Sequence, residues 1–217
     1  MRQRKAKDLE NRLQLCSAYL VEKPDPGCWE QTFGNDHPVY LEIGCGKGNF
    51  IIQKALENPD KNYIAVEGQE TVILRALEKA REHDLTAEEP KLTNLKFMLT
   101  FVHQMSEFFQ EDQLAGVYLN FSDPWPKARH AKRRLTYHKR LEDYRWAIRP
   151  GGFIEVKTDN DPLYEFSMEE IRSLGYRITE QTTDLHASDY DARHTLTEYE
   201  AKFSAAGKNI NYVKVEF

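Results

Sequence analysis

Three glycines at alternate positions, Gly44, Gly46 and Gly48, come directly after a short apolar segment. Glycine lets the backbone turn sharply and approach a ligand, because it has no Cβ. A dinucleotide-binding loop would need its third glycine at the position of Asn49, and a phosphate-binding loop would need Ser or Thr after Lys47. The spacing therefore predicts a ligand-binding loop that is neither a dinucleotide-binding loop nor a phosphate-binding loop.

Two glutamates flank this loop in the sequence. Glu42 lies two residues before the first glycine, and Glu67 lies nineteen residues beyond Gly48, at the end of the next apolar segment. A carboxylate at the end of the second strand accepts both ribose hydroxyls in dinucleotide folds. The acid-x-Gly-x-Gly-x-Gly pattern resembles motif I of S-adenosylmethionine-dependent methyltransferases, and an acid there suits a cofactor with a sulfonium and an ammonium group. The alternative is a tight strand-to-helix turn with an exposed glutamate at each strand end.

A rigid aromatic residue lies beside an acid in the segment Asp123-Pro124-Trp125-Pro126. Proline fixes φ on both sides of the indole, so Trp125 is expected to be held in place. Such a pair at the carboxyl end of a strand can stack a nucleobase while the carboxylate accepts its N–H groups. The segment is similar to the acid-Pro-Pro-aromatic loop of amino-methyltransferases that act on nucleobases. The alternative is a proline-rich turn in which Trp125 packs inward and Asp123 serves as a cap.

The charge of the chain is unevenly distributed. A formal net charge of −5 and an isoelectric point near 5.9 argue against a simple basic nucleic-acid-binding protein, for which values above about 9 are typical. The segment 127–140 nevertheless has no acid and seven basic side chains, here called the basic stripe: Lys127, Arg129, Lys132, Arg133, Arg134, Lys139 and Arg140. Beside a pocket that fits a base, the basic stripe predicts contacts with phosphates, the alternative being a solvated surface.

Several classes of protein are disfavoured by what the sequence lacks. No apolar run approaches the ~20 residues of a membrane span, and the basic residues 1–7 are not followed by the apolar stretch of a signal peptide. Three cysteines without a C-x-x-C spacing argue against a disulfide framework or a zinc site. Seven histidines show no paired spacing for metal ligation. We therefore expect a cytoplasmic protein that binds no metal and has no membrane partner.

The elements that must position these residues alternate between strands and helices. Apolar runs predict strands at 39–43, 62–66, 95–99, 116–121 and 153–156, and helical spacing of apolar residues predicts helices at 49–57, 70–82, 138–148 and 163–174. This order predicts an α/β fold, a mostly parallel sheet with helices on both faces and ligands at the carboxyl ends of the strands. A turn is expected at 149–152, and the segments 176–182 and 210–217 are expected to pair as a C-terminal antiparallel hairpin.

The amino-terminal segment precedes this alternation. Apolar residues recur at helical spacing before Pro24, which predicts one helix over residues 8–21: Leu9, Leu13, Cys16 and Leu20. We expect residues 1–30 to form a helical extension and residues 31–217 to form a single domain.

Longer motifs are similar to those of the bacterial tRNA (guanine-N7-)-methyltransferase family. The most specific is the block from Asn120 to Thr136, which contains Asn-Phe-Ser-Asp-Pro-Trp-Pro-Lys, Arg-His and Lys-Arg-Arg-Leu-Thr. The resemblance runs nearly end to end through shorter segments: Phe33-Gly34-Asn35-Asp36, the loop from Glu42 to Gly48, Lys157-Thr158-Asp159-Asn160, Asp184-Leu185-His186 and Thr197-Glu198-Tyr199-Glu200.

This resemblance implies a Rossmann-like class I methyltransferase domain. The implied reaction moves a methyl group from S-adenosylmethionine to N7 of a guanine in the variable loop of tRNA, with Asp123 as the catalytic acid between cofactor and base. The expected cofactor-binding residues are Glu42, Gly44, Gly46, Gly48, Glu67, Phe101 and Asp123. The residues expected to contact the substrate or RNA are Trp125, Lys127, Arg129, His130, Lys132, Arg133, Arg134, Asp159, Thr197, Glu198, Tyr199 and Glu200.

One position departs from the family pattern. The family usually has an acid after the third strand, near the adenine, and counting back without gaps from Asn120 puts that position at Phe101. Two alternatives follow for the adenine. Either a neighbour such as His103 or the backbone replaces the missing contact, or Phe101 stacks on the ring.

The implied chemistry needs no general base, because guanine N7 has a free lone pair and no proton to lose. The enzyme must align the reacting atoms and exclude water, and Asp123 is expected to stabilise the positive charge that arrives on the base. The rival hypotheses are a noncatalytic RNA-binding module with the same fold and an enzyme that methylates a protein or a small molecule. The sequence leaves open which tRNAs are modified, whether residues 1–7 are ordered, and whether the chain forms a homodimer.

Overall fold

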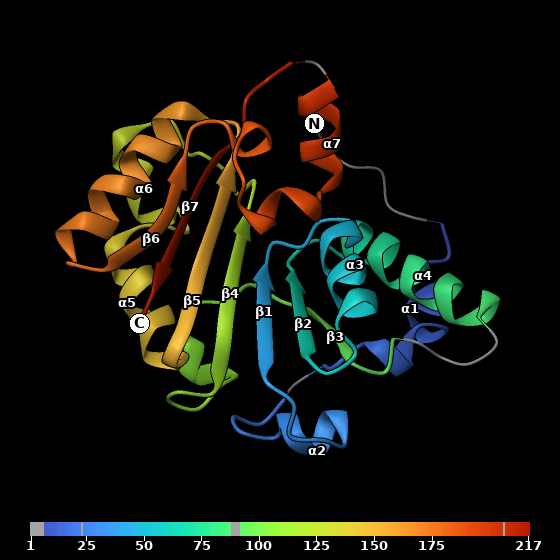
Figure 1. The fold of residues 1–217 in the computed structure, drawn as a ribbon. Helices are drawn as coiled ribbons and strands as arrows, with labels where there is room; N and C mark the ends of the chain where they lie inside the picture. The colour runs from blue at the N-terminus through green and yellow to red at the C-terminus, as the bar shows by residue number, and fades with distance from the viewer. Residues whose placement is uncertain (1–6, 23, 88–91, 206) are drawn as a thin grey trace.

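The centre of the molecule is a seven-stranded sheet (Figure 1). The computed structural model describes residues 7–22, 24–87, 92–205 and 207–217. The strands lie in the order β3-β2-β1-β4-β5-β7-β6, and their bounds are Val39–Ile43 (β1), Asn62–Glu67 (β2), Leu95–Leu99 (β3), Leu114–Asn120 (β4), Ile148–Thr158 (β5), Arg177–Thr182 (β6) and Asn211–Glu216 (β7). The strands from β3 to β5 pair in parallel, whereas β7 pairs antiparallel with both β5 and β6. The predicted mostly parallel sheet with a C-terminal antiparallel hairpin is therefore confirmed.

Helices cover both faces of this sheet. Their bounds are Leu9–Gln14 (α1), Trp29–Phe33 (α2), Asn49–Glu57 (α3), Glu70–Thr86 (α4), His138–Ala147 (α5), Asp161–Ser173 (α6) and Glu198–Ala205 (α7). Successive strand residues point to opposite faces, so Ile64 and Val66 of β2 pack in a core with residues of α5 and α6. Tyr63 and Ala65 pack in a second core with residues of α3 and α4. Within the described residues no helix is long and apolar enough to cross a membrane.

The single helix predicted over residues 8–21 is wrong. α1 ends at Gln14 and a separate 3-10 turn follows over Ser17–Tyr19. Leu20 then forms a parallel bridge with Phe97 of β3, and the Val21 N–H donates to the Phe97 carbonyl oxygen at 2.9 Å. Pairing with the edge strand needs extended backbone, so the helix stops before it.

Two further elements differ from the sequence-based expectation. The helix α2 was not expected; its fully buried Trp29 belongs to the core with α5 and α6 and donates to the Phe108 carbonyl oxygen at 2.8 Å. The segment expected as a turn, 149–152, lies inside β5, where the register with β4 shifts between Leu114 and Gly116. The other expected strands and helices agree with the structure to within four residues at either end.

The carboxyl ends of the parallel strands lie at one edge of the sheet, and α7 lies over this edge (Figure 1). Leu185 and Ala192, which lie in the segment that leads to α7, form a small apolar core with Tyr212 of β7 and with Ile210 directly before it. α7 was not expected from the sequence. The fold therefore brings the C-terminal segment to the edge where ligands bind in parallel α/β sheets.

Candidate functional site

The glycine loop joins β1 to α3 in a conformation that glycine favours. Gly44, Gly46 and Gly48 have φ values of 81°, 58° and 80°. A Cβ on Gly48 would lie 2.7 Å from the Cβ of Ala76 in α4, whereas a Cβ on Gly44 or Gly46 would meet no atom within 4 Å. The Gly44 N–H donates to the Val66 carbonyl oxygen at 2.8 Å, which fixes the loop against β2. The first two glycines therefore face open space, and the third packs against a helix.

Glu42 is buried at the end of β1, beneath this loop. The Asn120 amide at the end of β4 donates to Glu42 Oε1 at 2.8 Å. Two acceptor atoms of this pair, Glu42 Oε2 and Asn120 Oδ1, are buried and have no hydrogen-bond partner among the described residues. Burial raises the pKa of Glu42 to about 8, and the carboxylate of Glu198 adds to this effect. The pair thus offers two buried acceptors to a donor that the described residues do not supply.

Glu67 connects the glycine loop to the residues after β2. It is half-buried, and its carboxylate accepts from the Gly46 N–H at 3.2 Å and from the Gln69 N–H at 2.9 Å. Burial raises the pKa of Glu67, and these backbone donors oppose the increase. The ring of Phe101 lies against Gly68, since a Cβ on Gly68 would fall 2.2 Å from it, and Phe101 is 63% exposed. An open aromatic face therefore lies next to the acid expected to bind ribose.

The loop that contains Asp123 is held in an unusual backbone conformation. Phe121 and Trp125 both have positive φ, at 50° and 42°, which is uncommon for aromatic residues. Arg134 stabilises this loop, because its guanidinium donates to the carbonyl oxygens of Pro124 and Trp125, each at 3.1 Å. The Asp123 side chain is exposed, and no described residue donates a hydrogen bond to it. Its charge is close enough to Glu67 to contribute to the raised pKa of that carboxyl.

The ring of Trp125 lies outside the core clusters and contacts two side chains of its own segment. The guanidinium carbon of Arg133 lies 4.8 Å from the centroid of its ring, and His130 meets the ring edge-on at 5.7 Å between centroids. A more exposed aromatic face in this region belongs to Tyr199, which is 62% exposed and stacks with Phe121 at 6.4 Å between centroids. Trp125 was expected to stack a base. In the structure its ring contacts Arg133 and His130 of its own segment, and the stacking of a base stays a prediction.

The basic stripe divides into five exposed residues and two that bond to backbone. Arg140 donates to the carbonyl oxygens of Val102 and His103 at 2.8 and 2.7 Å, and Arg134 holds the Asp123 loop as described above. Arg134 is half-buried and bonded within the chain, and its expected contact with RNA stays a prediction. The five exposed residues are Lys127, Arg129, Lys132, Arg133 and Lys139.

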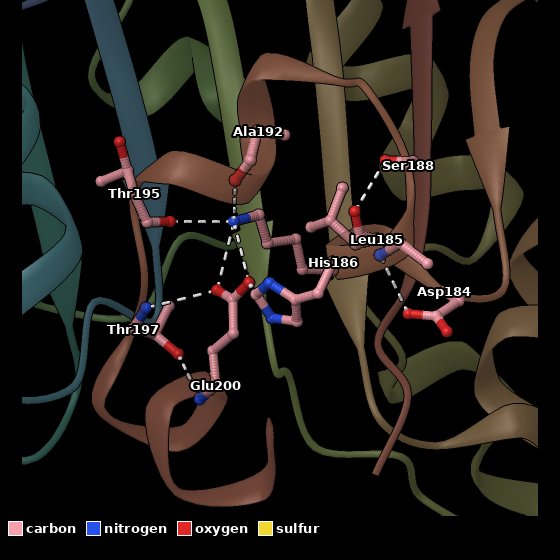
Figure 2. Close-up of polar contacts among 10 residues, drawn as sticks. Asp184, Leu185, His186, Ser188, Ala192, Thr195, Thr197 and Glu200 are labelled. Carbon is pink, nitrogen blue, oxygen red and sulfur yellow. Dashed lines mark hydrogen bonds and ion pairs between the residues drawn. The ribbon is translucent and has the colours of Figure 1, made fainter. Parts of the chain in front are cut away.

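The segment 197–200 is the start of α7, and two of its residues point inward. Thr197 Oγ1 accepts from the Glu200 N–H at 3.0 Å, and Glu200 Oε2 accepts from the Thr197 N–H at 3.3 Å. This reciprocal arrangement is a capping box. Glu200 is fully buried and its carboxylate lies 3.1 Å from Lys157 Nζ (Figure 2). Thr197 and Glu200 thus bond within the chain and Tyr199 is exposed, and the expected contacts of this segment with the substrate stay predictions.

Glu198 faces the glycine loop instead of the basic stripe. Its carboxylate lies 2.6 Å from Lys79 Nζ of α4, and the same ammonium donates to the carbonyl oxygen of Lys47 at 3.0 Å and to the side chain of Asn49. Asp159, the remaining residue expected to contact the substrate, is half-buried directly before Asn160, which caps α6 by accepting from the Leu163 N–H. One lysine thus ties α7 to the glycine loop.

Comparison with known proteins identifies the family. A family model described as "Putative methyltransferase" matches residues 36–213. The "tRNA (guanine-N(7)-)-methyltransferase" of Streptococcus uberis is 40% identical over 219 residues, covering 100% of both chains. That of Lactococcus lactis subsp. cremoris strain SK11 is 41% identical and covers 100% of this chain and 98% of its own. This chain belongs to the tRNA (guanine-N7-)-methyltransferase family.

Solved structures show how this family member folds. An antibiotic-related methyltransferase matches with a TM-score of 0.61 at 15% identity, covering 87% of this chain and 92% of its own. The 16S rRNA methyltransferase KamB matches with a TM-score of 0.58 at 12% identity, covering 100% and 96%. At these identities the likeness concerns the fold alone. Together with the sheet order it confirms the predicted Rossmann-like class I methyltransferase fold.

Three residues that the sequence reasoning missed belong to the site of this family member: Asn120, Lys79 and Lys157. Asn120 was read only as part of a motif, although its position at the end of β4 next to β1 brings it to Glu42. Lys79 carries no signal in the sequence, since it is one charge among many on the amphipathic helix α4. Lys157 lies in a strand whose other buried residues are uncharged, and a lysine at such a position indicates a buried anionic partner.

Proposed function

We propose that this chain transfers a methyl group from S-adenosylmethionine to N7 of a guanine in the variable loop of tRNA, giving N7-methylguanosine and S-adenosylhomocysteine. The proposal places this reaction in the cytoplasm. The observation that carries it is the buried pair of Glu42 and Asn120, which has two acceptors without donors beside an open glycine loop. An ammonium group supplies several N–H donors and a positive charge, and S-adenosylmethionine has both.

The residues of the loop fit this cofactor. Gly44 and Gly46 leave the space that a Cβ would fill, Glu42 supplies a buried carboxyl for the ammonium group, and Glu67 lies where a ribose is bound in related folds. Phe101 presents an open ring beside Glu67. When bound, S-adenosylmethionine would supply the electrophilic methyl group that is transferred.

The residues on the substrate side fit a purine. Phe121 lies two residues before Asp123 and its ring stacks with that of Tyr199, and the exposed part of the basic stripe begins at Lys127. Aromatic faces stack bases that have left a helix, and lysine or arginine side chains hold the neighbouring phosphates. We assign Tyr199 as the base platform in place of Trp125.

Asp123 acts by electrostatics in this mechanism. The guanine N7 attacks with its own lone pair, so no side chain needs to remove a proton, and the product base carries a positive charge. The exposed carboxylate of Asp123 receives no hydrogen bond from the described chain, so it is available to the base. It would orient the base by accepting its N–H groups and stabilise the positive charge as it develops.

The proposed function is tested by mapping the methyl group. The protein is incubated with labelled S-adenosylmethionine and unmodified tRNA, and the modified nucleotide is identified after nuclease digestion. Label at N7 of a guanine in the variable loop is the expected result. Label on adenine, on protein or on a small molecule would overturn the proposal.

Phe101→Ala is expected to weaken binding of S-adenosylmethionine by about tenfold, because one stacked base contributes on the order of 1–3 kcal/mol. The effect on turnover at saturating cofactor should be small, since Phe101 lies beside Glu67 and not at the Asp123 loop. Calorimetric titration of the free protein measures the affinity. Phe101→Tyr, which keeps the ring, is the matched control, and equal affinities for all three proteins would assign the adenine contact to His103 or the backbone.

Binding of tRNA is expected to depend strongly on salt. If the five exposed residues of the basic stripe neutralise phosphates, log K should fall with log salt at a slope of about −4. The double variant Arg129→Gln/Lys132→Gln should make this slope shallower by about 2. Arg177→Gln, which changes an exposed arginine at the start of β6 outside the basic stripe, is the control and should leave the slope unchanged. A flat salt response of the unmodified protein would favour a protein partner over RNA.

A further inference from the structure

A lysine is buried at the carboxyl end of β5. Lysine side chains are almost never fully buried in folded proteins unless they have a partner. Lys157 is 1% exposed. Its ammonium group lies 3.1 and 3.3 Å from the two oxygens of Glu200, and it donates to the carbonyl oxygens of Ala192 and Thr195 at 2.5 and 2.9 Å (Figure 2). All four acceptor atoms belong to residues 192–200. The Lys157 side chain of the sheet therefore bonds both to the segment before α7 and to the first turn of α7.

Glu200 completes this arrangement from the other side. Its carboxylate accepts from the Thr197 N–H in the capping box of α7, and His186 Nε2 lies 3.3 Å from its Oε1 (Figure 2). The carboxylate is fully buried. A buried charge that loses its partner is strongly unfavourable, whereas removal of both charges together is tolerated much better. The ion pair of Lys157 and Glu200 can therefore hold the segment 185–200 in one position.

The segment that this ion pair holds presents side chains in two other directions. Tyr199 stacks with Phe121, and the Phe121 N–H donates to the carbonyl oxygen of Lys157 at 2.8 Å. Glu198 pairs with Lys79, which also bonds to the glycine loop. Thus a single turn of helix connects the buried ion pair, the aromatic face beside Asp123 and the cofactor-binding loop.

We propose that Lys157 and Glu200 are positioning residues, whose buried ion pair fixes the segment 185–200 over the carboxyl edge of the sheet so that Tyr199 and Glu198 face the reacting groups. Glu200 then serves the reaction without contacting tRNA. The catalytic part of this inference rests on the proposed function, whereas the ordering of the segment does not.

Hydrogen exchange of the free protein, without cofactor or tRNA, tests the ordering. Glu200→Gln keeps the capping box but leaves the charge of Lys157 unpaired, and Lys157→Met leaves the charge of Glu200 unpaired. Each single variant should raise exchange in residues 185–205 by about tenfold with little change elsewhere. The double variant Lys157→Met/Glu200→Gln has no buried charge and should recover much of the protection. Lys214→Met, which removes another ion-paired lysine from β7, is the control.

Kinetics of tRNA methylation test the positioning. The single variants should lose about tenfold in kcat/KM for tRNA, mainly through KM, and the double variant should regain much of this loss. If Glu200 contacted tRNA directly, the double variant would be as impaired as Glu200→Gln and exchange in the free protein would be unchanged. That result would overturn the proposal.

A second variant keeps the test decisive if a single variant fails to fold. Thr197→Ala weakens the same capping box without leaving a buried charge, and it should raise exchange in residues 185–205 in the same direction. Unchanged exchange in Thr197→Ala would overturn the ordering role. If exchange responds as expected but the methyl group is found elsewhere than on tRNA, the ordering role stands and the proposed function fails.

Discussion

Asp123→Asn is expected to lower the rate of methyl transfer by about a hundredfold, the size of effect seen when one electrostatic stabiliser of a transition state is removed. The affinity for S-adenosylmethionine should change by less than about threefold. The reason is that the positive charge reaches the base only during transfer, so the negative charge of Asp123 matters more in the transition state than in the bound state. Asparagine keeps the shape of the side chain and removes its charge.

The measurement is a single-turnover rate with enzyme in excess over tRNA, so that release of the product tRNA does not limit the rate. Calorimetric titration with S-adenosylmethionine supplies the affinity. The control is Asp112→Asn, which neutralises an exposed aspartate just before the amino end of β4. This substitution should leave the single-turnover rate and the affinity for S-adenosylmethionine unchanged. Full turnover by Asp123→Asn would remove this residue from the catalytic role.

The parts of this protein that the sequence predicts are those set by local patterns. The spacing of apolar residues gives the bounds of β1, α3 and β3 as the structure has them. Because parallel strands end at the same edge of a sheet, residues at or just after the carboxyl ends of strands, such as Glu42, Glu67 and Asp123, can be assigned to one region from the sequence. Glycine at alternate positions likewise predicts the turn, since all three glycines adopt positive φ.

The parts that the sequence does not predict depend on partners far along the chain. Arg134 looks like its neighbours in the basic stripe, and only the fold brings its guanidinium to the carbonyl oxygens of the Asp123 loop. The same holds for Lys157, whose partner Glu200 is 43 residues away. The helix α7 is a different case. Its capping box, Thr-x-x-Glu, is a local signal for a helix start, but few apolar residues follow it at helical spacing.

This difference has a consequence for residues assigned through a motif. The segment 197–200 matches a motif of its family as a block, although its four side chains do three different things in the fold. Thr197 and Glu200 cap the helix and bind Lys157, Glu198 pairs with Lys79, and Tyr199 stacks beside the Asp123 loop. Burial separates these side chains in the free protein, because Thr197 and Glu200 are buried whereas Tyr199 is exposed.

Glu42→Gln is expected to weaken binding of S-adenosylmethionine by at least about a hundredfold, because it removes one member of a buried pair of opposite charges. The same substitution should make the ligand-free protein more stable at pH 8. Both effects have one cause, which is that Glu42 is buried without a cation of its own. The carboxylate is costly to the empty protein and favourable once an ammonium group binds.

The sign of the stability effect follows from the pKa. Burial raises the pKa of Glu42 from 4.5 to about 8 in the folded protein, so between these values the folded chain holds a proton that the unfolded chain has lost. Stability from this group is fully present below pH 4.5 and is lost as the pH rises to about 8. The loss is about 3 kcal/mol at pH 7. Glutamine does not titrate, so the gain in Glu42→Gln should be larger at pH 8 than at pH 5.

Urea denaturation of the free protein at pH 5 and pH 8 measures this gain. Glu57→Gln, which changes an exposed glutamate of α3, is the control and should show no such dependence on pH. A stability difference between Glu42→Gln and the unmodified protein that is equal at both pH values would contradict the buried, protonated state of Glu42.

Cofactor binding should also release a proton from Glu42 near pH 7. A bound ammonium group favours the ionised carboxylate, so it lowers a pKa that burial had raised above the pH of the solution. Calorimetry in two buffers with different ionisation enthalpies counts the protons released, and the count for Glu42→Gln should be smaller by nearly one. The variant is measured at a cofactor concentration that compensates for its weaker affinity. Equal proton counts would mean that the ammonium group is held elsewhere and that Glu42 is a structural residue of the loop.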